Sequence, residues 1–548
     1  MTKNSQKEPS GMEYPRYENR ISSFLANKYV FSVLLITVIG LLFRIHHIEF
    51  GLPHSFHADE PEIVELAIKY TYEIRDIISN NDWYKLVPIS YVYGTFPTYL
   101  LTFLTMGFSK INGLLGITFE KMHIYIFLRI ITSLISLSVI PVGAILYNKL
   151  FRDRKGAVIA ASLLALNWKL IVHAHYVNMD IFVSTLLFWS FLSMYMYFKK
   201  DTDTVYTVIS GLLVGFSIGT KFTTLLTVPL FLYLFLKKKD YRGLFAFGFI
   251  IFGTFLATNP FSIIFATNFT FRIYSMMFKE AGMVFDSVDH NIFKYVSALI
   301  YMTTLPLVIS SFFGKAAARK DNENTPFHIF LIGHIVFYLA FYSLQSRLVF
   351  RWLLPILPIM LLYSAKGFII LKEKLPKKAY YLFICISAAY YVSFPLLLLK
   401  QFQRNTPKSA AYIWMQENAD PSTNKLVYTE EGLDPMNKLP GARVLRYKAY
   451  EYEGAQYFLP ENPIGYNYIV LASRPMENYK KPEIIEKYPY YFEKWARFEH
   501  ELLHGERYEL VKKFVLPKPN LIPLSDIYIY KNKKPVPENV NSPIYQFL

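Results

Sequence analysis

Residues 30–48, VFSVLLITVIGLLFRIHHI, form the first long apolar run of the chain, and Phe56-His57-Ala58-Asp59-Glu60 follows shortly after it. At about 1.5 Å per residue, a helix of this length crosses a hydrocarbon core of about 30 Å. The run therefore predicts a membrane-spanning helix, with Asp59 and Glu60 emerging at a membrane surface. Two adjacent carboxylates so close to a bilayer indicate a functional site.

The rest of the chain is equally apolar. Its 548 residues are 53% hydrophobic and 18% aromatic, and the mean hydropathy is +0.24, which indicates a polytopic membrane protein. The net charge of +17 comes mainly from lysines and arginines in short clusters between apolar runs. Such clusters mark cytoplasmic loops and argue against nucleic-acid binding. Cys385 is the only cysteine, which excludes an intrachain disulfide and a thiolate metal cage.

Charge also predicts the topology. About a dozen apolar runs occur before residue 401, and every basic cluster between them is cytoplasmic only if one run between Asp59 and Lys149 does not cross. The exception is predicted at 95–117, which opens with Gly94-Thr95-Phe96-Pro97, as an amphipathic helix in the outer interface. About eleven crossings remain, and Asp59 and Glu60 lie outside the cell membrane.

Three regions are expected on this basis. Residues 1–28 are a basic cytoplasmic tail without a signal-peptide cleavage site, and 29–400 form the transmembrane domain. Residues 401–548 form an extracytoplasmic α/β domain, which begins with a helix capped at Asn405-Thr406-Pro407. Within it we predict strands at 425–429, 468–472, 508–515 and 526–531, a helix near 482–503, and an unstructured tail after residue 534.

Polar residues at helix ends sort largely to the outer surface. Besides the two acids they are Arg129, His173, His175, Asp180, Lys221, Arg272, His290, Arg347 and Arg351. A cavity with both signs of charge at one surface suggests that an anionic group is handled there. For any single residue, snorkelling to water explains its position equally well.

Asp59 and Glu60 are adjacent, so in a helix they point about 100° apart and do not form a facing pair. One of them can act as a base while the other holds position or a cation. An apolar stripe after Pro61 predicts that an interfacial helix starts here: Ile63, Leu66, Ala67 and Tyr70. A plain helix-capping role for Asp59 stays open.

The stretch from His173 to Asp180 lacks a zinc-binding spacing, which leaves only a loosely held divalent cation, near Glu60 and His175, as an open option. Asp180 either pairs with Lys85 or Lys221 and shapes a loop, or takes part in catalysis.

Lys221 interrupts an apolar hairpin, and its buried charge is costly unless water, a carboxylate or a phosphate contacts it. Arg347 and Arg351 flank Phe350, and guanidinium groups suit phosphate oxygens. The chain has neither a Walker loop nor a Rossmann glycine motif, which argues against a nucleotide-driven pump.

Several motifs, taken in order, resemble those of glycosyltransferase family 39, a group of C-type membrane glycosyltransferases. They are the Asp59-Glu60 pair; Tyr93, Pro97, Tyr99 and Leu100; Arg129; the His175 region to Asp180; Gly211 to Lys221; Asn259 to Phe261; and Arg351 to Pro358. The family includes protein O-mannosyltransferases and the transferases that add aminoarabinose to lipid A. The resemblance covers residues 30–400 and the start of the external domain.

The resemblance implies that a hexosyl or pentosyl group moves from a polyprenyl-phosphate donor to an acceptor hydroxyl, with inversion, outside the membrane. It makes Asp59 the general base and gives Glu60 a supporting role toward the acceptor or a cation. Phosphate is already a good leaving group and needs charge stabilisation, which Arg129, Lys221, Arg347 and Arg351 could supply. His57, His175, Asp180 and Lys85 would support the site, and the acceptor is a glycan, lipid or protein.

Lys85-Leu86-Val87-Pro88 is only a loose counterpart of the lysine and two prolines of the lipid A transferases, and the loop 263–292 is too short for the insert domain of eukaryotic protein mannosyltransferases. A lipid flippase or transporter is the main alternative. It predicts pseudo-repeats and charges at mid-depth, neither of which the sequence displays. A non-catalytic scaffold would not need Asp59.

Overall fold

A computed structural model describes residues 27–57, 59–88, 91, 93–118, 120–200, 204–275, 292–318, 323–345, 349–430, 435–447, 463–473, 477, 480–487, 489–522 and 524–536. The predictions for the tail 1–26, His290, Arg347 and the residues after 536 fall outside these ranges.

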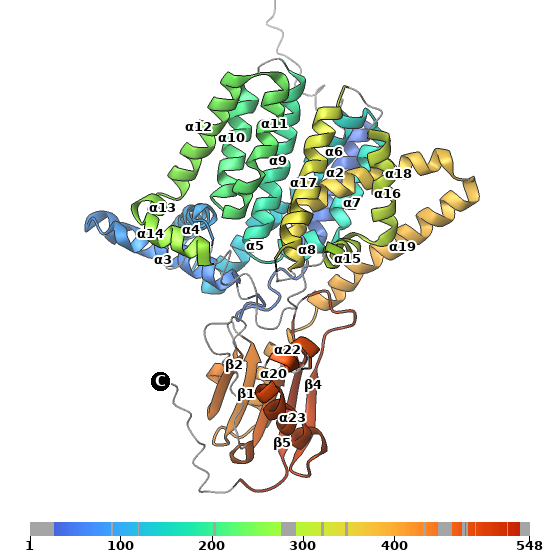
Figure 1. Cartoon of the computed structure of the whole chain (residues 1–548). Helices are drawn as coiled ribbons and strands as arrows, with labels where there is room; N and C mark the ends of the chain where they lie inside the picture. Colours follow the sequence, from blue (N-terminus) through green and yellow to red (C-terminus); the bar gives the residue numbers. More distant parts are fainter. Residues whose placement is uncertain are drawn as a thin grey trace, which may run out of the picture.

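A bundle of apolar helices occupies the first three quarters of the chain, and a small α/β domain hangs from one end of it (Figure 1). The helices of the bundle are α2 Lys28–Ile45, α5 Lys121–Leu137, α6 Val139–Phe151, α7 Arg154–Leu166, α8 Trp168–Ala174, α9 Met179–Lys199, α10 Thr204–Ile218, α11 Val228–Lys238, α12 Tyr241–Thr258, α15 Ile292–Thr303, α16 Leu305–Ala318, α17 Thr325–Ser343, α18 Leu357–Lys374 and α19 Lys377–Phe402. Short 3-10 helices connect some of them: η1 Trp83–Leu86, η2 Phe222–Thr227 and η4 Phe350–Ile356.

Length and composition make this a membrane protein. Among the described residues seven helices are long and apolar enough to cross a membrane, or nine if each of two bent pairs counts as one span. The two apolar segments α10 and η2–α11, which the sequence prediction counts as crossings, fall short of that length. The number of crossings stays a prediction.

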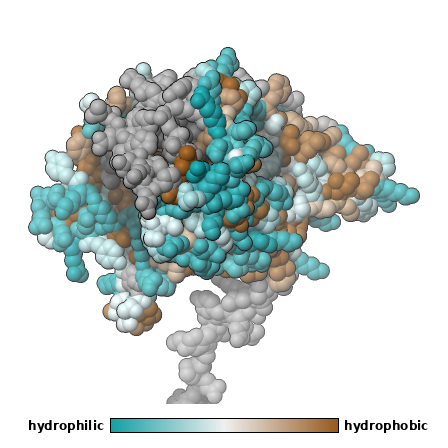
Figure 2. Space-filling view, turned by 90° about the horizontal axis from the view of Figure 1, so that it is seen from below, coloured by the Kyte–Doolittle hydropathy of each residue, from teal (hydrophilic) through white to brown (hydrophobic). Residues whose placement is uncertain are grey.

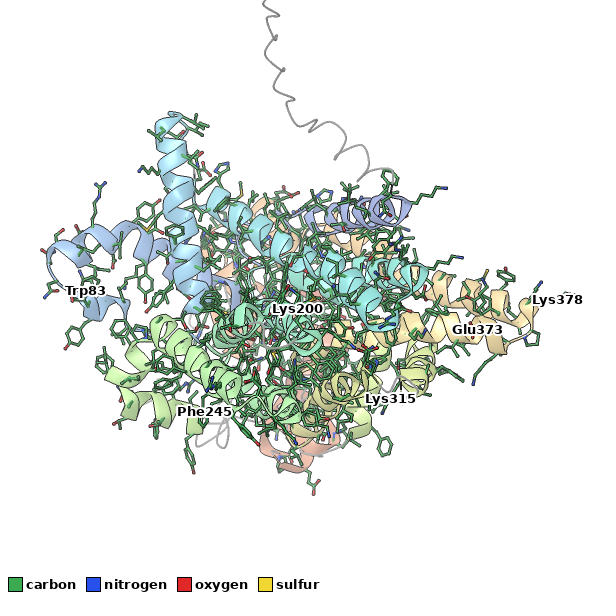
Figure 3. The ribbon with its side chains drawn as sticks, turned by 90° about the horizontal axis from the view of Figure 1, so that it is seen from above. Trp83, Lys200, Phe245, Lys315, Glu373 and Lys378 are labelled. Atoms are coloured by element: carbon green, nitrogen blue, oxygen red, sulfur yellow. The ribbon has the colours of Figure 1, made fainter. Side chains whose placement is uncertain are left out.

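Basic residues gather at the end of the bundle opposite the small domain. In the view from above, Lys200, Lys315 and Lys378 stand at helix ends on that side (Figure 3). The view from below shows hydrophilic residues over much of the opposite face, and apolar residues on the projecting edge that α19 forms (Figure 2). This distribution fits a bilayer around the flanks of the bundle.

Two further helices lie across the bundle axis at the end that carries the small domain (Figures 1 and 3). They are α3 Asp59–Ser79 and α4 Phe96–Leu114, and the short helices α13 Phe261–Ile264 and α14 Ala266–Tyr274 lie beside them. The predicted interfacial segment 95–117 corresponds to α4, and α3 buries Ile63, Ala67 and Tyr70 of its predicted stripe.

Arg44 fixes a bend between α7 and α8, which meet at 51°. Its fully buried guanidinium donates hydrogen bonds to the carbonyls of Leu164 and Ala165, at 3.2 and 3.1 Å, and to Gly40 of its own helix. The last carbonyls of a helix have no partner within that helix, so Arg44 satisfies two groups that the end of α7 exposes. Asn167 then starts α8 by accepting hydrogen bonds from the amides of Lys169 and Leu170.

The small domain is a mixed five-stranded sheet in the order β2-β1-β3-β5-β4. Its strands are β1 Lys425–Glu430, β2 Ala442–Tyr447, β3 Tyr468–Ala472, β4 Tyr508–Phe514 and β5 Ile527–Asn532, with helices α20 Pro407–Asn418, α22 Pro482–Lys487 and α23 Pro489–His504. Strands β2, β1 and β3 are parallel, and β5 and β4 are antiparallel to their neighbours. The four predicted strands are confirmed; β2 is an additional strand. Thr406 caps α20 as predicted, by accepting from the amide of Ser409 at 3.1 Å.

An apolar cluster joins the domain to the bundle. Leu516, Leu521 and Ile522 pack with Trp168 of α8 and Phe402 of α19. The side-chain amide of Gln401 donates hydrogen bonds to the carbonyls of Pro517 and Pro519, at 2.6 and 2.9 Å. The domain therefore covers the end of the bundle at which α3 and α8 lie.

Candidate active site

Four of the charged residues predicted from sequence meet at the end of the bundle that faces the small domain. Asp59 is the first residue of α3, Asp180 lies in the first turn of α9, Lys221 stands in the break between α10 and η2, and Arg351 belongs to η4. Each lies at a break or a helix end, where apolar side chains give way to polar ones. Segments far apart in sequence thus contribute to one cluster.

Arg351 is the centre of this cluster. Its Nη2 lies 2.9 Å from Oδ2 of Asp59, and its Nε lies 3.1 Å from Oδ2 of Asp180. Asp180 in turn accepts a hydrogen bond from Nζ of Lys221 at 2.6 Å through its other oxygen. The partner of Asp180 is therefore Lys221 rather than Lys85, together with Arg351, and the four side chains form an alternating row of charges.

Asp59 keeps one carboxylate oxygen uncommitted. Its contacts with Arg351, with the Tyr93 hydroxyl at 3.1 Å and with Nδ1 of His57 at 3.8 Å all use Oδ2. The side chain is 22% exposed. Within the described part of the chain, Oδ1 is thus free to meet a substrate.

The pKa of Asp59 reflects this setting. Burial alone would raise it, but the nearby Arg351, His57 and Lys221 and the hydrogen bond from Tyr93 together lower the pKa below its ordinary value. Asp59 is accordingly a carboxylate at neutral pH, as a general base requires. Burial, together with the negative charges of Asp59 and Asp180, raises the pKa of Tyr93 well above its ordinary range, so its hydroxyl stays a donor.

His57 is a neutral acceptor in this arrangement. Nη1 of Arg351 lies 2.7 Å from its Nε2, and a guanidinium only donates, so that nitrogen carries no proton. Burial lowers the pKa of His57 to about 4, which agrees with a neutral ring. The ring also stacks on Tyr176, with centroids 4.4 Å apart. His57 therefore positions the guanidinium of Arg351.

Glu60 and Arg129 form a separate, fully buried pair. Nε and Nη2 of Arg129 donate to the two carboxylate oxygens of Glu60 at 2.7 and 2.6 Å, and Nη1 donates to the carbonyls of Ile48 and Phe50. Glu60 also accepts from the Val177 amide at 3.1 Å. This geometry disfavours the expectation that Arg129 meets a donor phosphate or that Glu60 meets an acceptor, because both side chains are enclosed and bonded to each other. They join the loop after α2 to α5 and to the start of α9.

The residues around Glu60 do not fit the divalent cation that the sequence left open. Both oxygens of Glu60 bind Arg129, and the two ring nitrogens of His175 face the carbonyls of Ile171 and His46 at 2.9 and 3.0 Å. Among the described residues, no group of three histidine, cysteine or acidic side chains is placed to hold a metal ion. His175 thus joins α8 to the end of α2.

Lys85 lies apart from the cluster. Its Nζ pairs with Asp82 at 3.4 Å on η1, and the side chain is largely exposed. Trp83, next to it, stands at the outer end of this segment, away from the bundle (Figure 3). Arg347 belongs to the residues outside the description, so its predicted role in phosphate binding stays a prediction.

A glycine-rich contact positions Tyr93 and Lys221. The amides of Gly94 and Phe96 donate to the carbonyls of Thr220 and Gly219, at 3.0 and 3.1 Å. A Cβ on Gly94 would collide with the Gly219 carbonyl, so only glycine fits there. Asn259 supports the same loop, because its side-chain oxygen accepts from the Thr95 amide at 2.9 Å.

The sequence prediction missed several residues of the site. Tyr93 was noted only as part of a motif, and its hydroxyl binds Asp59. Tyr176 binds Nδ1 of His173 through its hydroxyl, at 2.7 Å. Lys169, a lone lysine within the apolar run WKLIV, was not considered. A charged residue inside an apolar segment was the signal that could have identified it.

Chemically, the cluster offers a buried carboxylate with one free oxygen next to a guanidinium and an ammonium. The carboxylate can accept a proton, and the cations can stabilise negative charge that develops on a neighbouring oxygen. The four residues contact one another directly, so both functions act within one small space.

Comparison with known proteins gives one family match and several similar folds. Residues 88–243 match the model of the N-terminal domain of protein O-mannosyl-transferase TMEM260. A search of curated proteins gave no significant match. Among solved structures, the chain is similar to ArnT from Cupriavidus metallidurans bound to undecaprenyl phosphate, with a TM-score of 0.50 and 12% identity over 94% of this chain and 98% of ArnT.

The oligosaccharyltransferase of Archaeoglobus fulgidus, solved with zinc and sulfate, gives a TM-score of 0.50 and 14% identity over 82% of this chain and 69% of that protein. A second structure, of AglB from the same organism with an inhibitory peptide and a dolichol-phosphate, gives 0.47 and 13% identity; it aligns with 74% of this chain, and the chain spans only 62% of AglB. The chain therefore has the fold of the C-type membrane glycosyltransferases, with an O-mannosyl-transferase-like segment at residues 88–243, and the family resemblance of its motifs is confirmed.

Proposed function

We propose that this protein is a membrane glycosyltransferase that moves a hexosyl or pentosyl group from a polyprenyl-phosphate donor to an acceptor hydroxyl. The observation that carries the proposal is Asp59: an ionised carboxylate with a free Oδ1, held beside Arg351 at the membrane-surface end of the bundle. The fold shared with ArnT and with the archaeal oligosaccharyltransferase supports the reaction class.

In the proposed reaction the acceptor hydroxyl approaches Asp59 and attacks the anomeric carbon of the donor. A bond forms between the acceptor oxygen and that carbon, and the bond from the carbon to the phosphate oxygen breaks. The hydroxyl proton passes to Oδ1 of Asp59, and the electron pair leaves on the polyprenyl phosphate. A single displacement of this kind inverts the anomeric configuration.

Arg351 and Lys221 supply the positive charge for the leaving phosphate. Both are engaged by aspartates, and Arg351 is 18% exposed, so an arriving phosphate would share these cations with Asp59 and Asp180. Drawing Arg351 toward the phosphate would weaken its hold on Asp59. The carboxylate would then become a stronger base at the moment when the donor is in place.

The side of the membrane follows from the basic clusters. Lys200, Lys315 and Lys378 stand at the end opposite the site. By the positive-inside rule, this supports a site and a domain 401–548 outside the cell membrane and a tail 1–28 in the cytoplasm. A donor of this class carries its sugar on a lipid, which brings it to the same surface. The proposed step is written without a metal ion, since the described residues place no group of three histidine, cysteine or acidic side chains to hold one.

The test is sugar transfer by purified protein in detergent or liposomes. A radiolabelled polyprenyl-phosphate sugar is supplied with an extract of surface glycans, lipids and proteins as acceptor. Asp59→Asn should lower the transfer rate about 100- to 10,000-fold, the usual contribution of a general base. Asp82→Asn is the matched control, because Asp82 is an exposed aspartate that pairs with Lys85.

Transfer by Asp59→Asn at the wild-type rate would exclude Asp59 as the base. Movement of the labelled lipid across liposomes, without any glycosylated product from the wild-type protein, would replace the proposal by a flippase.

A further inference from the structure

Behind Arg351, a series of contacts leads to two residues that the proposed reaction has not used. Arg351 contacts His57, His57 stacks on Tyr176, and the Tyr176 hydroxyl lies 2.7 Å from Nδ1 of His173. One turn earlier on α8 stands Lys169, which interacts electrostatically with Arg351 and Asp180. His173 and Lys169 therefore adjoin the charge cluster on the side of α8.

Lys169 is a cation without an anionic partner. The residue is only 8% exposed, and in the part of the chain that the structure describes its ammonium has no hydrogen bond or ion pair. Its Nζ lies 5.1 Å from the centroid of the Trp168 ring. Enclosing a lysine in a membrane domain is unfavourable unless a compensating group is present.

His173 has a similar deficit. The residue is 3% exposed, and its Nε2 is buried without a partner among the described residues. If the Tyr176 hydroxyl donates to Nδ1, the imidazole hydrogen is on Nε2, and that nitrogen is a donor in need of an acceptor. His173 lies within electrostatic range of Lys169, Arg351 and Lys221.

The charges of the whole cluster do not balance. Asp59 and Asp180 contribute two negative charges, while Arg351, Lys221 and Lys169 contribute three positive ones, and His57 is neutral. Buried charges are normally paired, so an excess cation beside an unsatisfied donor indicates that an anion completes the site. Three cations and an N–H donor suit an anion with several oxygens.

We infer that Lys169 and His173 form an anion subsite that binds the phosphate of the polyprenyl-phosphate donor and holds it after the sugar has left. This inference rests on the proposed function and extends it, because Arg351 and Lys221 are already committed to aspartates, whereas Lys169 is not. The break between α7 and α8 gives the subsite its position, since the bend directs α8 across the end of the bundle.

The experiment measures binding of three probes to the full-length protein in detergent: farnesyl phosphate, farnesol and inorganic phosphate. Lys169→Met should weaken farnesyl phosphate binding about 10- to 100-fold, the effect of losing one charge-assisted hydrogen bond. Binding of farnesol should stay unchanged. Lys169→Arg should retain most of the affinity, and His173→Phe should lose a smaller part of it.

Lys400→Met is the matched control, because Lys400 is an exposed lysine at the same end of the bundle. This variant should bind all three probes as the wild type does. Equal farnesyl phosphate affinity of the wild type and Lys169→Met would overturn the inference. If inorganic phosphate binds as tightly as farnesyl phosphate and with the same dependence on Lys169, the subsite serves a free phosphate and the lipid assignment is wrong.

A parallel transfer assay separates this result from the proposed function. A wild-type protein that binds farnesyl phosphate through Lys169 but transfers no sugar would contradict the proposed reaction and leave the subsite standing. A wild-type protein that transfers sugar while Lys169→Met keeps full affinity would contradict the subsite alone.

Discussion

The guanidinium of Arg351 lies 2.9 Å from the carboxylate of Asp59, although the two residues are far apart in the sequence of the membrane domain. Arg351 keeps the carboxylate ionised by lowering its affinity for a proton. The free protein is therefore in a resting arrangement, in which the proposed base is available but weak. An anion that attracts Arg351 would raise the affinity of Asp59 for a proton. Donor binding would therefore strengthen the base.

The pKa of Asp59 leads to a pH prediction. The Tyr93 hydroxyl is one of the groups that lower this pKa, so Tyr93→Phe should raise it, and the base should become protonated at a higher pH. We expect the acidic limb of the kcat/KM profile to move up by about half to one pH unit, the effect of one hydrogen bond. At high pH, where Asp59 is ionised in both proteins, the variant should approach the wild type.

The control for this measurement is Tyr99→Phe. Tyr99 belongs to the same region, but its hydroxyl donates to the carbonyl of Leu86 and not to Asp59. An acidic limb that does not move in Tyr93→Phe would mean that Asp59 is not the group whose titration limits the rate.

The Glu60 and Arg129 pair leads to a stability prediction. Arg129→Met leaves a buried carboxylate without its partner, and we expect a loss of about 3–5 kcal/mol in unfolding free energy. The readout is thermal unfolding of the purified protein in detergent. The double variant Glu60→Gln with Arg129→Met should recover part of the loss, because the uncompensated charge is then gone.

Glu49→Gln serves as the control for this series, since Glu49 is exposed and pairs with His47. If Arg129→Met unfolded at the wild-type temperature but lost donor binding, Arg129 would belong to the phosphate site after all.

Arg44 should matter for stability without touching the site. Arg44→Met would leave the carbonyls of Leu164 and Ala165 without partners in a buried setting, at a cost of about 2 kcal/mol or more. Because these carbonyls end α7, we also expect slower sugar transfer through displacement of α8. Lys155→Met, an exposed change on α7 itself, should leave both properties unaltered, and equal melting of Arg44→Met and Lys155→Met would contradict this role.

The contact of Gly94 with Gly219 can be tested with a single methyl group. Gly94→Ala places a Cβ against the Gly219 carbonyl, so the loops that position Tyr93 and Lys221 must separate. We expect a loss of transfer activity of at least tenfold, since small displacements of catalytic groups are costly. Gly107→Ala is the matched control, because no atom lies within 4 Å of a Cβ at that position. Equal activity of the two variants would show that the contact is dispensable.

Much of the architecture was predictable because it depends on patterns along the chain. The apolar runs and the basic clusters predicted a membrane bundle, the proline at the start of α4 marked a helix that does not cross, and Thr406-Pro407 predicted the beginning of the small domain. Strand β2 was missed, because apolar and charged side chains alternate only weakly in its sequence ARVLRY, Ala442–Tyr447. It pairs with β1 in the sheet, and pairing partners are not visible in one sequence.

The candidate site was predictable only as a set of residues. The sequence by itself determined that acids and cations stand at helix ends on one surface, because a charge inside an apolar segment must reach that surface or find a partner. Tertiary structure alone decided the pairs. Asp180 pairs with Lys221 and Arg351, Glu60 is enclosed with Arg129, and Lys169 has no anionic partner among the described residues. Such pairs depend on distances between helices that are far apart in sequence.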